Sequence, residues 1–345
     1  MSELALYRKY RPSAFDEVLG QDHIVKVLKG ALKLGNISHA YLFYGPRGTG
    51  KTSIARIVAS ELGTKDHDIY EIDAASNRKI EDIREVRDSV RTMPFDSKYK
   101  VYIIDEVHML TKEAFNALLK TLEEPPAHVI FILATTELEK VPDTIVSRCQ
   151  TFTFHKPNIS ILKDLVISIA KKEGVKIDNA GAELIALLGD GSFRDTQSTL
   201  QKVMSFSKDK VLSTKEIEEV TGAPSGELVN NFIISIVESD IEKGLKAIKS
   251  AEEKNIDIAI YLKLILIKLR LALLMRYAPE MKKILEEEIV DSDKEFFKEV
   301  LKEKKGMITS KTLEALLEAE RNIRHSFIKS LPLESALIKM VGVLQ

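Results

Sequence analysis

The chain has 345 residues, 44% of them hydrophobic and 30% charged, which is typical of a folded globular protein long enough for two or three domains. Its 51 lysines and arginines nearly cancel its 52 acidic residues, so any contact with nucleic acid requires a local basic cluster. The single cysteine, Cys149, excludes an intrachain disulfide and a cysteine-built zinc site, and it fits a reducing compartment. Residues 1–11 are charged and lack the apolar core of a signal peptide, so we expect a cytoplasmic protein.

The first half of the chain alternates short apolar runs of strand type with amphipathic stretches of helical type. The helical stretches include Ser53–Leu62 and Ile80–Arg91. This alternation predicts an α/β domain over residues 1–156, in which helices cover both faces of a parallel sheet. The runs that we predict as strands are Ala40–Tyr44, Asp68–Ile72, Val101–Ile104, Val129–Ala134 and Thr151–Phe154.

A phosphate-binding loop follows the first of these runs. Residues 45–52 match the P-loop pattern G-x-x-x-x-G-K-[ST] in full, and a helical stretch follows them. Its glycines allow consecutive backbone N–H groups to surround an anion, and the N-terminus of a helix adds partial positive charge. We expect Lys51 to reach the outer phosphates of ATP and Thr52 to bind Mg²⁺. The predicted nucleotide contacts are Gly45, Pro46, Arg47, Gly48, Thr49, Gly50, Lys51, Thr52 and Ser53.

Two carboxylates end the third run. The apolar residues Val101–Ile104 predict a buried strand, and ligands of open α/β sheets bind at the carboxyl ends of the strands. We therefore expect Asp105 to hold Mg²⁺ and Glu106 to act as the general base toward water. Alone, these residues could be a strand that ends in solvated acids. With the P-loop, they predict an ATP hydrolase.

The second half of the chain is predicted to be helical. Short helices are expected from Ile159 to Val220, followed by a connector at residues 221–226 that contains glycine and proline. We predict a small helical domain at 157–221 and an all-α domain at 222–345. The apolar segment Ile256–Ala278 is long enough to cross a bilayer. It contains internal charges that would be costly in lipid, so we predict a buried helix and no membrane contact; the charges are Asp257, Lys263, Lys268, Arg270 and Arg276.

Several stretches resemble AAA+ ATPases of the clamp-loader type. Residues 7–21 are similar to their N-terminal box, 147–149 to their Ser-Arg-Cys motif, and 191–195 to their sensor 2 region. Residues 71–76 and 109–126 are very close to the pattern of the gamma/tau subunits of bacterial DNA polymerase III. The resemblance covers nearly the whole chain; it is dense in the first 200 residues and weak after them. It implies a P-loop AAA+ domain, a helical lid domain and a C-terminal collar domain that joins subunits.

The resemblance also assigns roles to residues outside the two motifs. It places Arg11, Pro12 and Val18 in the adenine pocket and makes Thr136 the polar sensor 1 residue. It makes Arg148 a finger that completes the ATP site of a neighbouring subunit. Arg194 becomes the lid arginine that folds over the nucleotide. Without the family, Thr136 would be an ordinary strand end and the two arginines surface side chains.

The function implied is that of an ATPase subunit in a ring of clamp-loader subunits, which opens a sliding clamp and places it on primer-template DNA. One alternative is a DNA-remodelling AAA+ motor such as a branch-migration helicase. Another is a structural loader subunit that does not hydrolyse ATP, although the intact Lys51, Asp105 and Glu106 argue against it.

The family also suggests a DNA-contacting surface. Family members grip DNA phosphates with the helix near residue 84 and with the first turn of the helix near Thr111, which points to Arg78, Arg84 and Thr111. Acidic residues on the same helix leave a solvated, ion-paired face as a rival interpretation; they are Glu81, Asp82, Glu85 and Asp88.

The chain departs from the family pattern in two places. Gamma/tau subunits usually carry a four-cysteine zinc module between the first helix and the second strand. Here residues 62–70 connect these elements directly, so we expect no zinc. The chain also ends at Gln345 without a basic or proline-rich extension, so it resembles the short gamma form or a longer protein cut at that length.

Overall fold

The computed structural model describes residues 4–77, 80–207, 209–278, 280, 291–302 and 308–342. The chain divides into two compact units. The first unit comprises Met1–Ile169 and Ile185–Gln201, and the second comprises Ala170–Leu184 and Lys202–Gln345. The predicted domain boundaries at residues 156 and 221 stay predictions.

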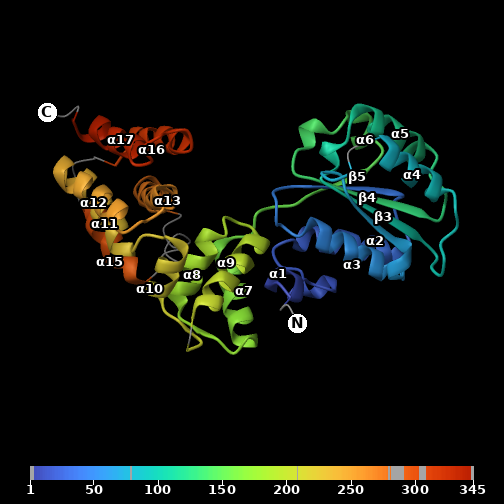
Figure 1. Ribbon diagram of the computed structural model, residues 1–345, viewed down its shortest axis with the longest axis horizontal. Coiled ribbons are helices and arrows are strands. Elements are labelled where there is room, and N and C mark those ends of the chain that lie inside the picture. Colours follow the sequence, from blue (N-terminus) through green and yellow to red (C-terminus); the bar gives the residue numbers. More distant parts are fainter. Residues whose placement is uncertain are drawn as a thin grey trace. The chain divides into compact units, whose positions relative to one another are not determined.

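The first unit is built on a five-stranded parallel sheet in the order β2-β3-β4-β1-β5 (Figure 1). The predicted strands are confirmed, each to within one residue at its ends. Strands β3 and β4 are almost wholly buried, which explains why the sequence shows them as continuous apolar runs. The strands are β1 (Ala40–Tyr44), β2 (Ile69–Asp73), β3 (Lys100–Asp105), β4 (Val129–Thr135) and β5 (Gln150–Thr153).

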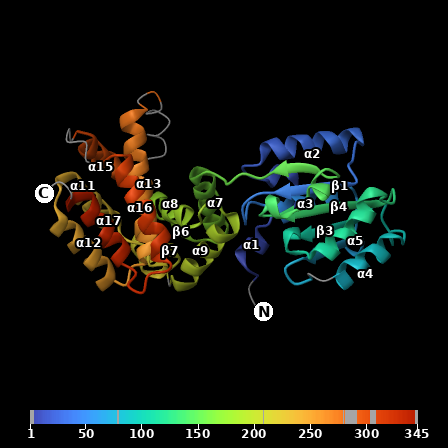
Figure 2. The same ribbon diagram turned by 90° about the horizontal axis from the view of Figure 1, so that it is seen from above.

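Helices cover both faces of this sheet, as predicted (Figure 2). Alternate residues of each strand point to opposite faces, so Leu42 and Tyr102 belong to one core and Tyr41 and Val101 to the other. The first core is shared with α4 (Ile80–Val90), α5 (Lys112–Glu123) and α6 (Asp143–Val146), and the second with α2 (Asp22–Leu34) and α3 (Lys51–Glu61). The amphipathic stretch predicted at Ile80–Arg91 is confirmed as α4, which packs on the sheet through Ile83, Val86 and Val90.

Shorter elements connect these layers. An N-terminal helix, α1 (Leu6–Lys9), precedes the first 3-10 turn. The longer helices that follow the sheet contain residues of both units; they are α7 (Ile159–Lys172), α8 (Asn179–Leu188) and α9 (Phe193–Phe206). The 3-10 turns are η1 (Phe15–Glu17), η2 (Asp66–Asp68), η3 (Val107–Met109) and η4 (Leu138–Lys140).

The prediction that strands end before residue 157 was wrong in one detail. The second unit contains a two-stranded parallel sheet of β6 (Lys176–Ile177) and β7 (Val211–Leu212). Each strand has only two residues, which is too short to produce the alternation that identifies strands in a sequence.

The remainder of the second unit is helical. The predicted connector is confirmed, because Gly222 ends α10 in the left-handed conformation and Ser225 caps α11. The segment expected to form a buried helix is α13, which Asp257 caps, and no helix in the described ranges is long and apolar enough to cross a membrane. The helices are α10 (Thr214–Thr221), α11 (Gly226–Glu238), α12 (Ile241–Glu253), α13 (Ile258–Tyr277), α15 (Asp291–Lys302), α16 (Ser310–Ile323) and α17 (Leu331–Val341).

Candidate nucleotide site

The phosphate loop joins β1 to α3 through a backbone that only glycine adopts easily. Gly45, Gly48 and Gly50 have φ angles of 151°, 72° and 102°. A Cβ atom at Gly45 would lie 2.4 Å from the carbonyl oxygen of Phe154, and one at Gly48 would lie 2.0 Å from Oγ of Ser192. The loop is therefore held close to its neighbours, and the unpaired N–H groups at the start of α3 follow it directly. This cradle fits a phosphate chain.

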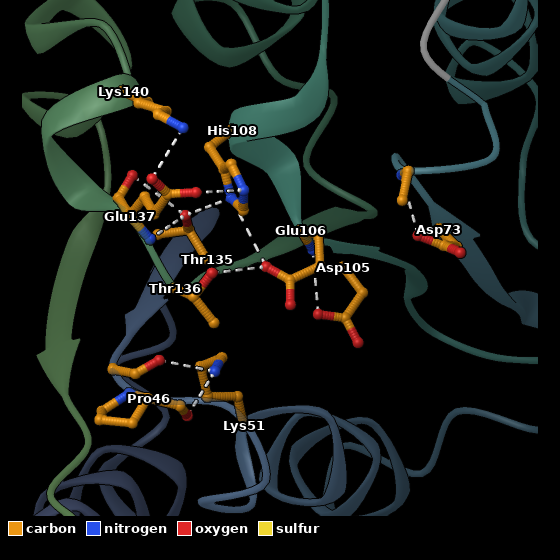
Figure 3. Close-up of polar contacts among 12 residues, drawn as sticks. Pro46, Lys51, Asp73, Asp105, Glu106, His108, Thr135, Thr136, Glu137 and Lys140 are labelled. Atoms are coloured by element: carbon orange, nitrogen blue, oxygen red, sulfur yellow. Dashed lines mark hydrogen bonds and ion pairs between the residues drawn. The ribbon is translucent and has the colours of Figure 1, made fainter. Parts of the chain in front are cut away.

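Lys51 places a buried positive charge in this cradle. Lys51 is 5% exposed, and its ammonium group donates to the carbonyl oxygens of Gly45 at 2.7 Å and Pro46 at 2.9 Å (Figure 3). Burial lowers the pKa of Lys51, while the nearby carboxylates of Glu106 and Asp105 act in the opposite direction. The amine and the two carboxylates thus face one pocket.

Thr52 and Asp105 meet across the pocket and fit a magnesium ion. The Thr52 hydroxyl donates to Oδ2 of Asp105 at 2.7 Å, while Oδ1 of Asp105 accepts the backbone N–H of Glu106 at 3.0 Å. Mg²⁺ prefers oxygen ligands and is usually held by one or two protein groups together with phosphates and water. In the described parts of the chain, no cluster of three or more His, Cys, Asp or Glu side chains could hold a metal by itself. The pair is therefore suited to an ion that arrives with a nucleotide.

Glu106 is held by its backbone and by two neighbouring side chains. Its φ angle of 48° lies in the left-handed region, which is uncommon for a residue with a side chain. The Thr136 hydroxyl donates to Oε2 of Glu106 at 3.1 Å, and Nδ1 of His108 lies 3.5 Å from the same oxygen (Figure 3). Thr136 was expected near the hydrolytic group, whereas the sequence interpretation missed His108.

The N-terminal segment and α9 form another side of the pocket. Arg11, Pro12 and Val18 line it together with Arg194, whose guanidinium carbon lies 5.5 Å from the centre of the Tyr7 ring. Burial lowers the pKa of Arg11, and the neighbouring positive charges, including that of Arg194, lower it further. The sequence interpretation did not single out Tyr7.

Comparison with known proteins identifies the family. The DNA polymerase III subunit tau of Bacillus subtilis is 37% identical over 361 residues, covering 99% of this chain and 63% of that protein. The subunit gamma of Buchnera aphidicola is 39% identical over 262 residues, covering 70% of each chain. The chain belongs to the gamma/tau family of DNA polymerase III subunits. The resemblance noted in the sequence is therefore confirmed.

Two further matches bear on this gamma/tau family member. The family described as "DNA polymerase III, delta subunit" matches residues 63–158. The Holliday junction branch migration motor RuvB of Thermotoga maritima superimposes with a TM-score of 0.53 and 26% identity over 66% of this chain and 80% of that one. The predicted AAA+ fold is confirmed, and this family implies nucleotide binding. The chain spans less than two thirds of the Bacillus subtilis relative.

The structure gathers most of the predicted nucleotide residues around one pocket. Gly45 and Pro46 do not line it, but they hold Lys51, and Thr136 reaches it through Glu106. The predicted residues that do line the pocket are Arg11, Pro12, Val18, Arg47, Gly48, Thr49, Gly50, Lys51, Thr52, Ser53, Asp105, Glu106 and Arg194.

The remaining predicted residues lie elsewhere or outside the description. Arg148 does not line the pocket of its own chain; it donates to Oε1 of Glu123 at 2.7 Å and to the carbonyl oxygen of Thr144 at 2.8 Å. Thr111 caps α5, and its hydroxyl accepts the N–H of Ala114 at 3.3 Å. Arg78 and the side chain of Arg84 lie outside the described residues.

Proposed function

We propose that this gamma/tau family member is the ATP-hydrolysing subunit of a cytoplasmic sliding-clamp loader. The observation that carries the proposal is one pocket that joins the phosphate loop, the carboxylates of Asp105 and Glu106, and Arg194. Together they provide an anion cradle, a metal site with a base beside it, and a cation that can reach the phosphates, which are the parts that phosphoryl transfer requires.

Each group has a definite part in the proposed reaction. The loop N–H groups and Lys51 bind and orient the phosphates, and Thr52 and Asp105 would hold Mg²⁺, which neutralises phosphate charge when bound. Glu106 takes a proton from the attacking water while the water oxygen bonds to the γ-phosphorus and the bond from that phosphorus to the leaving ADP breaks. Thr136 orients Glu106 through the hydrogen bond to Oε2.

The position of Arg148 supports a site that is completed by another subunit. The Arg148 side chain is about one third exposed, and its guanidinium binds Glu123 and a backbone carbonyl, away from its own chain's pocket. An arginine from a neighbour can neutralise the charge that develops on the transferred phosphoryl group. Hydrolysis would then depend on assembly.

The clamp and DNA parts of the proposal rest on family membership. The proposed partners are other loader subunits in a ring, a sliding clamp and primer-template DNA. Contacts with DNA would be made to phosphates by Arg78, Arg84 and the first turn of α5 at Thr111, which suits a loader that acts at primer ends of any sequence. We propose no zinc site and no membrane partner.

The decisive experiment measures ATP turnover of the loader assembly with and without a sliding clamp and primed DNA. We expect clamp and primed DNA together to stimulate turnover more than either alone. Lys51→Ala should abolish both turnover and clamp loading. Loading that survives Lys51→Ala would show that this chain is a structural subunit.

A DNA-remodelling motor is the second candidate. The structural likeness to the Thermotoga maritima branch migration motor favours it. It predicts turnover that duplex DNA stimulates fully and to which a clamp adds nothing, so the same assay separates the two functions.

A further inference from the structure

His108 follows Glu106 by two residues in the turn after β3, and its ring lies next to the Glu106 carboxylate. It belongs to η3 (Val107–Met109), and its side chain is 5% exposed. Figure 3 shows the ring between Glu106 and the turn after β4 that carries Glu137. A buried imidazole in contact with two carboxylates needs a specific arrangement of protons.

One nitrogen of the ring is anchored on Glu137. Nε2 lies 3.2 Å from Oε1 of Glu137, and the other carboxylate oxygen pairs with Lys140 at 2.7 Å. The hydrogen bond from Lys140 lowers the pKa of Glu137, so this carboxylate is ionised at neutral pH and only accepts hydrogen bonds. Nε2 therefore faces an oxygen that can only accept, and a form of the ring with a proton on Nε2 suits this contact.

The other nitrogen faces Thr135 and Glu106. Nδ1 lies 2.9 Å from the Thr135 hydroxyl, which also accepts the N–H of Glu137 at 3.0 Å and donates to its carbonyl oxygen at 3.2 Å. These contacts fix the plane of the ring. Nδ1 is thereby set 3.5 Å from Oε2 of Glu106, the oxygen to which Thr136 also donates.

We propose that His108 is a positioning residue for Glu106, anchored by Glu137 and Thr135. The proposal rests on the ATPase function proposed above. A glutamate side chain has three rotatable bonds, and a base acts well only when its carboxylate is held in place. His108 and Thr136 both approach Oε2 of Glu106. They hold this oxygen in place, so that Oε1 is left to face the attacking water.

The first test separates turnover from nucleotide binding. We expect His108→Ala to lower kcat ~10–100-fold, the range for groups that act by orienting another functional group, with nucleotide affinity almost unchanged. His108→Gln, which keeps an amide N–H for Glu137, should retain more activity than the alanine variant. The matched control is His128→Gln, at another histidine whose ring bonds the carbonyl oxygens of Val90 and Thr92; it should turn over ATP like the wild type.

A second variant tests the anchor. Glu137 does not line the pocket, so Glu137→Ala should lower kcat only through His108. The double variant should then be no slower than His108→Ala alone, because the two side chains act along one path. Additive losses would contradict the proposed path.

A spectroscopic readout is independent of turnover. In protein with ¹⁵N-labelled histidine and no nucleotide, the His108 signal, assigned by its loss in His108→Gln, should show a protonated Nε2 that changes in Glu137→Ala. A proton on Nδ1 alone would overturn the anchor.

The outcomes distinguish this proposal from the proposed function. If the wild-type assembly does not hydrolyse ATP, the proposed function fails, and the histidine spectrum still tests the anchor. If the wild type is active and His108→Ala stays within about twofold of it, positioning is wrong. Nucleotide binding that falls in His108→Ala and His108→Gln as much as kcat would show a merely structural role.

Discussion

Gly48 lies where the phosphate loop touches the start of α9, and the contact depends on its missing side chain. The N–H of Phe193 donates to the carbonyl oxygen of Gly48 at 2.9 Å, and Oγ of Ser192 would lie 2.0 Å from a Cβ atom on this glycine. The left-handed φ of 72° adds a conformational cost of about 1–2 kcal/mol for any L side chain.

We therefore expect Gly48→Ala to weaken ATP binding by at least ~10-fold, since 1.4 kcal/mol is a factor of ten. Titration with a fluorescent ATP analogue measures this. The double variant Gly48→Ala/Ser192→Gly should regain part of the affinity. The second substitution removes the steric contact but leaves the conformational cost of the left-handed φ at residue 48. The control is Gly30→Ala, an exposed position in α2 with no atom near the added Cβ, which should stabilise the helix by ~0.5–1 kcal/mol. Unchanged ATP affinity in Gly48→Ala would show that the loop relaxes without cost.

At the level of single residues, the sequence predicted the groups that lie next to one another in the chain. The loop from Gly45 to Thr52 and the pair Asp105–Glu106 are contiguous motifs, so their chemistry was readable in advance. The contact of His108 with Glu137 and that of Tyr7 with Arg194 join different elements, and only the fold brings them together. The only sequence signal for His108 was its position two residues after Glu106.

At the level of elements, Lys268 joins three helices of the second unit. Its ammonium group on α13 bonds Asn230 of α11 at 2.7 Å and Asp293 of α15 at 2.8 Å, and its side chain is 14% exposed. Burial lowers the pKa of Lys268, and the charge of Asp293 opposes that effect. The charge of the buried Lys268 is therefore compensated by the carboxylate of Asp293.

We expect Asp293→Ala to destabilise the protein by about 3–5 kcal/mol, because it leaves a buried charge without its partner. Lys268→Met removes the charge and keeps the apolar stem, so it should cost far less. Thermal unfolding at neutral pH followed by circular dichroism measures both. A Lys268→Met variant that is as unstable as Asp293→Ala would mean that packing, not charge compensation, holds the three helices.

The elements themselves were largely predictable, for a physical reason. Strands such as β3 and β4 are buried on both faces, so their apolar runs are long and clear. Strands β6 and β7 have only two residues each, which is too short for a recognisable strand pattern in the sequence. By length alone, the segment that forms α13 could have been a membrane-spanning helix or a buried one. Its internal charges favoured the buried helix.

At the level of the whole molecule, the proposed role of Arg148 depends on its position, because this arginine does not line the nucleotide pocket of its own chain. Arg148 is instead paired with Glu123, and both side chains are partly exposed. In a ring with head-to-tail interfaces, each subunit would receive an arginine from one side and offer its own on the other. ATP hydrolysis would then require assembly of the ring.

We expect Arg148→Ala to abolish ATP turnover while nucleotide affinity stays at the wild-type value, and we expect wild-type turnover per chain to fall on dilution. Mixing Arg148→Ala with Lys51→Ala chains gives the sharper test. In a randomly mixed ring, about a quarter of the sites pair an intact Lys51 pocket with an intact Arg148 from next door, so turnover should partly return. Recovery requires that the guanidinium cross between subunits. Failure to recover in mixtures shown to co-assemble, or full activity of Arg148→Ala, would mean that each protomer completes its own site.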